Sequence, residues 1–296
     1  MKKQPELSVI TVNYNGLRDT ERMIESLQKH LTIQYELIVV DNGSVRDEAS
    51  ELQLKYPFLI TIRSEQNLGF AGGNNLGIKH ATSEYLFFLN NDTFVQDDFF
   101  SCLIDAMKQN PFLGGLSPKI IFADSEQGIQ FAGYTPLSRI TLRNHLIGFR
   151  QQDTGQFDKP HPTPYLHGAA MLIRRKAIEN AGMMPEIYFL YYEELDWSVQ
   201  IRRAGYELEY NPSATVYHLE SSSTGQESPL KAFYMTRNRL LFAQRNLSGT
   251  NRILSVSYQL LFAVPVKLLQ ALLTGRIILA KAMIRGCLSF ITMHLN

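Results

Sequence analysis

The sequence predicts an α/β fold with a mainly parallel central sheet, followed by a C-terminal helical extension suited to a membrane interface. Short apolar runs alternate with amphipathic stretches through the first half of the 296 residues, which is the pattern of βαβ units. Apolar residues make up 45% and charged residues 19% of the chain, as in a globular protein. The character of the chain changes at Pro229, so we expect two domains, residues 1–228 and 229–296.

Four strands are expected in the first half: Leu7–Asn13, Glu36–Val40, Leu59–Ile62 and Tyr85–Leu89. The fourth, YLFFL, is continuously apolar, which predicts a central strand that is buried on both faces. Each strand ends in a polar cluster. Because open α/β sheets bind ligands beyond the ends of their strands, these clusters are the first candidates for a site.

Helices are expected between these strands. Apolar residues at helical spacing predict a helix over Asp19–His30. A second helix, Asp47–Tyr56, ends before Pro57. A third, Asn74–Ala81, is expected to follow a glycine-rich loop.

The middle of the chain is less regular. Asp124–Thr163 contains glycines, prolines and polar residues without strong periodicity, which predicts loops with one hairpin. Regular structure is expected to resume with the strand His167–Arg174, the helices Arg175–Ala181 and Glu193–Ala204, and the short strands Tyr206–Tyr210 and Thr215–His218.

The C-terminal part is predicted to be helical, beginning with Lys231–Asn246. Ile253–Thr274 is strongly apolar, but Pro265 and Lys267 interrupt it, so it is borderline for the roughly 20 residues of a transmembrane helix. Gly275–Asn296 mixes basic and apolar residues, which suits a helix lying in the membrane interface. We expect peripheral membrane contact. The alternatives are a tail packed on the domain or on a second subunit of a homo-oligomer, and a true span.

Charge and cysteine content restrict the class of protein. A formal net charge of +1 argues against a nucleic-acid partner. Cys102 and Cys287 lack metal-ligand spacing and indicate reduced thiols in a cytoplasmic protein. The apolar stretch Leu7–Val12 is too short for a signal sequence. We therefore expect a protein at the cytoplasmic face of the cell membrane.

Two segments could contact a nucleotide. Asp41, at the end of a strand in VVDNGS, could accept hydrogen bonds from a base or ribose, and the alternative is an Asx turn. Asn67–Gly77 holds four glycines in eleven residues, which predicts tight turns or close approach to a ligand. Its spacing matches neither a P-loop nor the dinucleotide-binding fingerprint.

Several acidic residues could bind a metal ion or act as a catalytic base. Asp92 in LNNDT follows the buried strand and could bind a divalent cation against a diphosphate, with a helix cap as the alternative. Glu193, Glu194 and Asp196 begin a helix, where the dipole alone favours acids. One of them could instead deprotonate an acceptor hydroxyl. His218, if it joined an oxygen-rich site, would favour Mn²⁺ over Mg²⁺.

Taken in order, these segments resemble the inverting glycosyltransferase family 2, which has the GT-A fold. The likeness runs from Leu7 to about Asn246 and rests on five ordered motifs. NLGFAGGNNLGIKHA followed by FLNNDT is similar to the branch that contains bacterial rhamnosyltransferases of cell-surface polysaccharides.

The resemblance implies roles for individual residues. The family's Asp-x-Asp motif reads Asn90-Asn91-Asp92 here, which makes Asp92 the main carboxylate ligand of Mn²⁺ or Mg²⁺, and His218 matches a late metal-binding histidine. Glu194 falls on the position of the catalytic base. The acceptor-side residues implied are Glu193, Asp196 and Trp197. The donor-binding residues implied are Thr11, Asn13, Asp41, Asn42, Asn67, Gly69, Gly72, Asn91, His167 and Gly168.

The implied reaction is a single displacement with inversion. The favoured donor is dTDP-L-rhamnose, and the acceptor is a hydroxyl of a saccharide or lipid-linked saccharide in cell-envelope polysaccharide synthesis. The alternatives are a UDP- or GDP-sugar donor, and a catalytically weak nucleotide- or carbohydrate-binding protein, which the reduced Asp-x-Asp motif keeps open. A nucleotidyltransferase is disfavoured because Asn13–Gly16 has one glycine and no lysine.

Overall fold

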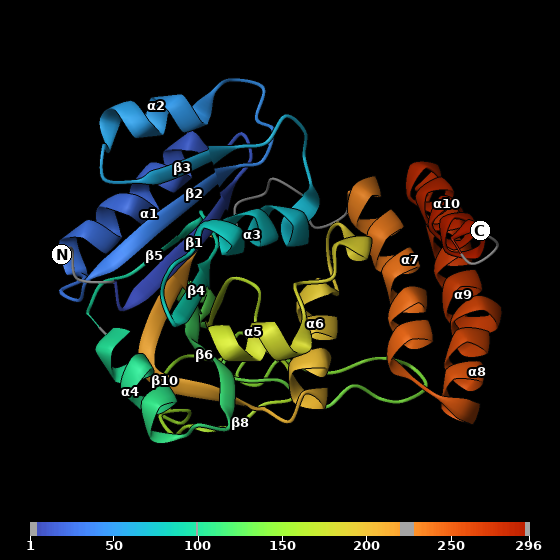
Figure 1. The fold of residues 1–296 in the computed structure, drawn as a ribbon. Helices are drawn as coiled ribbons and strands as arrows, with labels where there is room; N and C mark the ends of the chain where they lie inside the picture. Colours follow the sequence, from blue (N-terminus) through green and yellow to red (C-terminus); the bar gives the residue numbers. More distant parts are fainter. Residues whose placement is uncertain (1–4, 99, 220–227, 294–296) are drawn as a thin grey trace. The chain divides into compact units, whose positions relative to one another are not determined.

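The computed structural model describes residues 5–98, 100–219 and 228–293, which form two compact units (Figure 1). The first unit comprises Met1–Thr135, Leu146–Phe189 and Glu193–Glu220. The second comprises Pro136–His145, Leu190–Tyr192 and Ser221–Asn296. The last piece begins near the domain boundary expected at residue 228, and two short internal segments belong with it.

The first unit is built on a ten-stranded sheet. Its strands are β1 Leu7–Asn13, β2 Tyr35–Asp41, β3 Ile60–Arg63, β4 Tyr85–Leu89, β5 Thr93–Phe94, β6 Leu113–Phe122, β7 Ile129–Phe131, β8 His161–Pro162, β9 Ala170–Arg174 and β10 Glu207–His218. The order is β3-β2-β1-β4-β9-β6-β10-β5, with β7 beside β6 and β8 beside β10 (Figure 1).

The α/β prediction is confirmed, and the sheet is mixed rather than wholly parallel. Strands β3, β2, β1 and β4 are parallel, as are β6 and β10. Strand β9 runs antiparallel to both β4 and β6. Buried central strands of either direction read as continuous apolar runs, so strand direction was not readable from the sequence.

Helices cover both faces of this sheet. They are α1 Leu17–His30, α2 Glu48–Lys55, α3 Gly69–His80, α4 Phe100–Gln109, α5 Arg175–Ala181 and α6 Glu193–Arg203. Successive strand residues point to opposite layers, so Phe87 packs in the core on the α1, α2 and α4 side, and Phe88 in the core on the α3, α5 and α6 side. Both side chains are fully buried. The parallel strands therefore end between two helical layers.

The glycine-rich segment expected as a loop is helical from Gly69 onward. A Cβ atom on Gly77 would lie 2.4 Å from Cγ2 of Ile10, and one on Gly73 would lie 2.8 Å from Cγ1 of Val12. The glycines thus let α3 approach β1 more closely than side chains would permit. The prediction of a loop was wrong because it attributed these glycines to turns.

Several further elements differ from expectation. Strand β6 was not predicted from the sequence. It contains two glycines, and side chains of neighbouring residues pack closely against them. Residues 207–218 form one strand, β10, whose register shifts between Asn211 and Thr215, instead of two strands. The region expected as loops carries β7 and β8.

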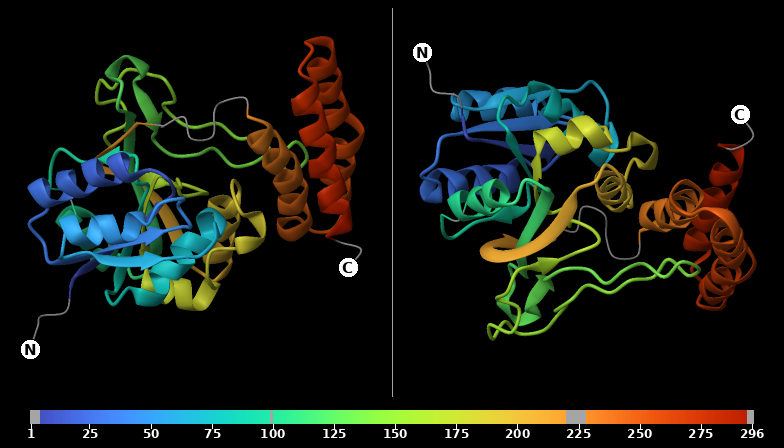
Figure 2. Two further views of the ribbon diagram at one scale, coloured as in Figure 1. Left: turned by 90° about the horizontal axis from the view of Figure 1, so that it is seen from above. Right: turned by 60° about the horizontal axis from the view of Figure 1, so that its bottom comes forward.

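The second unit is a helical bundle (Figure 2). Its helices are α7 Pro229–Asn246, α8 Gly249–Tyr258, the π-helical turn η4 Gln259–Ala263, α9 Val264–Leu273 and α10 Ile277–Thr292. A Cβ atom on Gly286 of α10 would lie 2.7 Å from the carbonyl oxygen of Phe233 on α7, so these helices are in close contact. The internal segment 136–145 joins the bundle where Ser255 Oγ donates to the Ile140 carbonyl at 2.9 Å.

Helices α8 and α9 form one run through η4, Gly249–Leu273, and Pro265 does not break it. Proline removes one backbone donor and crowds the carbonyl four residues earlier, and the π turn widens the helix at that point. Among the described residues, this run alone is long and apolar enough to cross a membrane, with a mean hydropathy of 1.5. Only 11% of its most apolar window is buried.

Candidate active site

The ends of β1 and β2 are fixed by internal hydrogen bonds. Asn13 and Asp41 are paired in register at these ends. Asn13 donates from Nδ2 to Glu48 Oε2 at 2.7 Å. Asp41 is fully buried and accepts from the backbone N–H of Ser44 at 3.0 Å and of Ala49 at 3.3 Å. Its carboxylate thus forms the Asx turn that was the alternative to ligand binding, and a nucleotide contact at Asp41 stays a prediction.

The predicted donor residues after β2 are connected to the start of α3. Asn42 Nδ2 donates to Asn67 Oδ1 at 3.1 Å and to the Gly69 carbonyl at 3.0 Å. Gly69 has a φ of +74°, and a Cβ atom there would lie 2.2 Å from the carbonyl oxygen of Phe189. A Cβ atom on Gly72 would lie 2.6 Å from Cβ of Leu68. Packing within the protein therefore accounts for both glycines.

Two other donor candidates lie near the same strand ends. Asn91 donates from Nδ2 to Thr20 Oγ1 at 3.0 Å, and Thr20 donates to Asn13 Oδ1 at 2.8 Å. Thr20 thereby ties the turn after β4 to the end of β1. Thr11 is fully buried in β1, and its Oγ1 has no hydrogen-bond partner within the described part of the chain.

Asp92 and His218 meet although 126 residues separate them. Strand β5 pairs antiparallel with β10 and places Thr93 opposite His218. Oδ1 of Asp92 then lies 3.1 Å from Nε2 of His218, and both residues are buried. The sheet therefore joins the two residues that the resemblance named as metal ligands.

Gln130 on β7 orients this pair. Its Oε1 lies 2.7 Å from Nδ1 of His218, so Nδ1 donates to it. In the neutral ring, Nε2 then presents a lone pair to the Asp92 carboxylate. Two electron-rich atoms at this separation fit the donor set of a divalent cation that also contacts substrate phosphates. Among the described residues no cluster of three His, Cys, Asp or Glu could hold a metal.

Asp19 is a further acid near this pair, which the sequence did not single out. It lies in the first turn of α1 and is partly buried. Burial raises the pKa of its carboxyl, and repulsion from the Asp92 carboxylate raises it further.

His167 and Tyr134 form an aromatic wall beside these residues. Their rings lie 6.2 Å apart and nearly parallel, and Phe131 packs 5.0 Å from the His167 ring. His167 Nδ1 accepts from the backbone N–H of Ala169 at 3.2 Å. Burial, with a smaller contribution from nearby His218, lowers the pKa of His167 to about 3. The imidazole is therefore neutral at physiological pH.

Glu194 lies at the start of α6 and is only half-buried. A Cβ atom on Gly168 would lie 3.8 Å from Cγ of Glu194, which brings the HGAAMLIR segment next to this acid. Burial raises the pKa of Tyr134, and the Glu194 carboxylate raises it further. The structure thus brings together Glu194, Gly168, Tyr134 and His167.

The other residues of this acidic segment are internal. Trp197 is 1% exposed, donates from Nε1 to the Gly182 carbonyl at 2.8 Å and packs edge-on against Phe88. Asp196 is fully buried and accepts from Gln200. Both side chains are held by contacts within the protein, and their expected acceptor-side position stays a prediction. Glu193 is likewise buried, at 3% exposure.

The backbone immediately before Glu193 is strained. Phe189, Tyr191 and Tyr192 have φ values of 64°, 69° and 79°, a region that costs non-glycine residues about 1–3 kcal/mol each. Within the second unit, Asn238 on α7 donates to the carbonyls of Leu190 at 2.7 Å and Tyr191 at 2.8 Å. No signal in the sequence singled out Asn238.

Comparison with solved structures places this fold among glycosyltransferases. The mannosyltransferase PcManGT from Pyrobaculum calidifontis, in complex with GDP-Man and Mn²⁺, has a TM-score of 0.59 at 13% identity and covers 98% of this chain and 88% of its own. GalNAc-T7 with UDP, GalNAc and Mn²⁺ has a TM-score of 0.61 at 16% identity, covering 86% and 54%. The fold is that of the GT-A glycosyltransferases.

The sequence comparisons define the family within this class. The sequence model "Glycosyl transferase family 2" matches residues 8–182, more than half of the chain. The chain belongs to glycosyltransferase family 2 and is a glycosyltransferase.

Two curated relatives cover most of the chain. The low-salt glycan biosynthesis hexosyltransferase Agl10 of Haloferax volcanii is 28% identical over 244 residues, 80% of this chain and 75% of the relative. The N-acetylglucosaminyl-diphospho-decaprenol L-rhamnosyltransferase of Mycobacterium tuberculosis is 25% identical over 242 residues, 75% of this chain and 78% of the relative.

Proposed function

We propose that the chain transfers L-rhamnose from dTDP-L-rhamnose, with inversion, to a hydroxyl of a lipid-linked saccharide in cell-envelope polysaccharide synthesis. The observation that carries the proposal is the meeting of Asp92 and His218 near the aromatic wall that adjoins Glu194. The activity for which the mycobacterial relative is named supports rhamnose and a lipid diphosphate acceptor. Other donors, such as UDP- or GDP-sugars, are outcomes of the test below.

In this mechanism Glu194 accepts the proton of the acceptor hydroxyl as that oxygen attacks the anomeric carbon. The bond to the nucleoside diphosphate breaks on the opposite face, and one base without an enzyme nucleophile gives inversion. Asp92 Oδ1 and His218 Nε2 would hold Mn²⁺ or Mg²⁺. When bound, that cation supplies positive charge to the departing diphosphate. The neutral ring of His167 can contribute a hydrogen bond from Nε2 at the donor side without adding charge.

Membrane contact is the second part of the proposal. The described residues of the second unit contain eleven Lys and Arg and no Asp or Glu. Large apolar side chains on α9 and η4 are exposed, among them Leu261 at 67% and Leu273 at 79%. Apolar residues mixed with basic ones favour a position in the interface of an anionic membrane, at the cytoplasmic face. A lipid-linked acceptor would be presented there.

The test is a thermal-shift panel of nucleoside diphosphates and nucleotide sugars with Mn²⁺, Mg²⁺ or EDTA, because ligands that bind only the folded state raise the Tm. We expect the largest shift with dTDP or dTDP-L-rhamnose and a divalent cation. A larger Tm shift with UDP or GDP would replace dTDP-L-rhamnose by a UDP- or GDP-sugar as the proposed donor. The absence of any nucleotide-dependent shift would contradict donor binding.

Measurement of kcat distinguishes an active transferase from a catalytically weak binding protein. Glu194→Gln should lower kcat about 10²–10⁴-fold, the usual contribution of a general base, while dTDP affinity stays within about twofold. Glu179→Gln, at an exposed acid on α5, is the matched control. A Glu194→Gln enzyme that retained its kcat would remove Glu194 from the role of base.

A further inference from the structure

Residues 136–145 form a closed hairpin in the second unit (Figure 2). At its tip the backbone N–H of Ser138 donates to the Arg143 carbonyl at 2.9 Å, and that of Leu142 donates to the Ser138 carbonyl at 3.0 Å. Below the tip an antiparallel bridge pairs Tyr134 with Leu146. The two arms of the hairpin therefore start and end beside Tyr134, a residue of the aromatic wall described above.

Helix α8 holds the tip of the hairpin through its backbone. Ser255 Oγ donates to the Ile140 carbonyl at 2.9 Å, and Gln259 Nε2 donates to the Thr141 carbonyl at 3.1 Å. Both donors are buried, and they lie about one helical turn apart. Because protein groups satisfy these carbonyls, the tip can leave water at a lower cost than a loop whose carbonyls depend on water.

The outer side of the tip is both basic and apolar. Ile140 is 41% exposed, and Arg139 and Arg143 lie in the same tip. Arg252 lies three residues before Ser255 and therefore on the same face of α8. All three arginines are exposed, and their guanidinium groups make no hydrogen bond or ion pair within the described part of the chain. The described residues of this unit include no acid that could pair with them.

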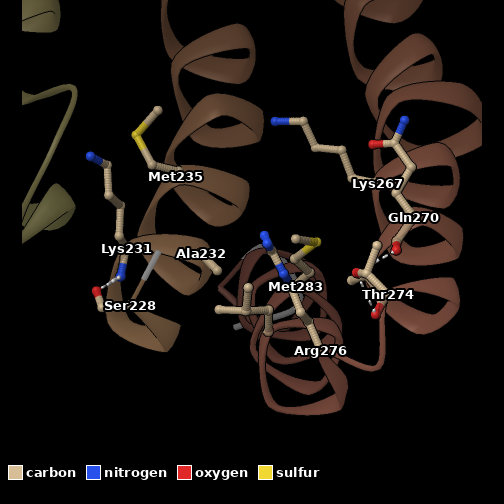
Figure 3. A pocket seen from close by; sticks show the side chains of 11 residues that line it. Ser228, Lys231, Ala232, Met235, Lys267, Gln270, Thr274, Arg276 and Met283 are labelled. Atoms are coloured by element: carbon tan, nitrogen blue, oxygen red, sulfur yellow. Dashed lines mark hydrogen bonds between the residues drawn. The ribbon is translucent and has the colours of Figure 1, made fainter. Parts of the chain in front are cut away.

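The helical run that carries this hairpin is polar inside and apolar outside. Lys267, Gln270 and Thr274 line a cavity of about 620 Å³ among α7, α9 and α10 (Figure 3). The exposed side of the run presents large apolar side chains, among them Phe262 at 61% and Leu269 at 58%. A helix in water has the opposite arrangement, so this exposed side is suited to an apolar surrounding.

A partner that is both anionic and apolar matches this surface. A soluble polyanion would pair with the three arginines but leave Ile140 and the exposed side of α9 in water. A neutral apolar surface would cover these side chains but give the arginines no counter-charge. The interface of an anionic bilayer supplies phosphate groups and an apolar layer within the reach of single side chains.

We propose that the hairpin 136–145 is a membrane-docking element, in which Ile140 enters the interface of an anionic bilayer and the three arginines contact the lipid phosphates. The proposal rests on the membrane contact proposed above and adds to it a segment from the middle of the chain. Since the hairpin begins two residues after Tyr134, docking of its tip ties the backbone of the aromatic wall to the membrane surface.

Vesicle flotation of the full chain measures this docking. The vesicles contain phosphatidylcholine alone or with about 30% phosphatidylglycerol, which makes their surface negative. We expect binding to the anionic vesicles to be at least about tenfold tighter. Arg139→Gln/Arg143→Gln should lose at least about tenfold in affinity, since each basic side chain near such a surface contributes about fivefold. The matched control, Lys29→Gln/Lys79→Gln, removes two exposed charges of the first unit and should bind like the wild type.

A fluorescent label reports on the tip itself. The environment-sensitive dye NBD is attached to Ile140→Cys in a Cys102→Ser/Cys287→Ser background, which removes the two native thiols. Its emission should shift to the blue with anionic vesicles, and bromine-labelled lipids should quench it. The same dye on Leu54→Cys, at a position 86% exposed on α2, should show neither change.

Several results would overturn the proposal. Unchanged emission of the dye at residue 140, while the chain floats with the vesicles, would exclude the hairpin and leave the C-terminal helices as the contact. Equal loss of affinity in the two double variants would indicate general positive charge. A wild type that does not float would overturn the membrane contact and this proposal together. Binding of dTDP with Mn²⁺ reports separately on the proposed transferase site and should be the same in all variants.

Discussion

Oδ1 of Asp92 lies 3.1 Å from Nε2 of His218, and the other ring nitrogen of that histidine is held 2.7 Å from Oε1 of Gln130. This chain of contacts fixes the orientation of the imidazole. Second-shell partners of metal-binding histidines commonly have this arrangement. Gln130 lies on β7, in the region that the sequence presented as loops.

Gln130→Met should therefore weaken metal-dependent nucleotide binding. The thioether has nearly the size of the amide but cannot accept the Nδ1–H bond, so His218 loses its fixed orientation. We expect the affinity for Mn²⁺ in the presence of dTDP to fall about tenfold or more. Titration calorimetry of Mn²⁺ measures it, and the control is Gln53→Met, at a half-buried glutamine that also accepts a side-chain hydrogen bond, from Thr61. Unchanged affinity would show that Gln130 does not support a metal ligand.

His167 should make stability depend on pH. Its folded-state pKa of about 3 lies below the roughly 6.5 of an unfolded histidine, so the unfolded state gains a proton first as the pH falls. Stability from this group is complete above about pH 6.5 and declines toward pH 3. Between pH 7.5 and 5.5 the loss should be about 1 kcal/mol.

Urea unfolding of the wild type and of His167→Asn measures this loss. The asparagine oxygen can accept from Ala169 in place of Nδ1, and it does not titrate. The variant should lack the additional decline between pH 7.5 and 5.5. Parallel curves for the two proteins would contradict a neutral, buried His167.

Replacement of Asn238 should lower kcat, because this side chain holds the backbone that precedes Glu194. Asn238→Ala removes the two hydrogen bonds that hold Leu190 and Tyr191, directly before the acids of α6. If Glu194 then relaxes by about an ångström, kcat should fall on the order of 10²-fold with little change in dTDP affinity. Leu241→Val weakens the same helix at a buried position and is the control for stability. Equal kcat in both variants would assign Asn238 a purely structural role.

Gly77→Ala should destabilise the protein although alanine favours helices. Helix propensity gains about 1 kcal/mol. The new methyl group meets Ile10 Cγ2 at 2.4 Å, and such overpacking costs about 1–3 kcal/mol. We expect a net loss of about 1 kcal/mol in urea unfolding. In an Ile10→Ala background, where that contact is absent, Gly77→Ala should be neutral or stabilising. If the free energies of unfolding lost in the two single variants simply added in the double variant, the contact would be contradicted.

The sequence was sufficient to predict those helices and strands that follow from a single local pattern. The apolar run of β4 and the amphipathic spacing of α1 gave both elements, with bounds correct to within two residues. The pairing of Asp92 with His218 came only from resemblance, because it depends on a contact between β5 and β10 across 126 residues. The burial of Asp41 and Asp196 was not readable from the sequence, because packing decides whether the protein or a ligand supplies the hydrogen bonds of an acid.

The segments that make up the second unit determine what a truncated chain would lose. Because Pro136–His145 and Leu190–Tyr192 belong to the same unit as the C-terminal helices, a fragment ending at residue 228 would lack the partners of both segments. The carbonyls of Leu190 and Tyr191 would lose Asn238, and the left-handed backbone at Tyr191 and Tyr192 could relax. The helices are thus not a detachable anchor, and an expressed N-terminal fragment would differ from the whole chain at the turn that precedes Glu194.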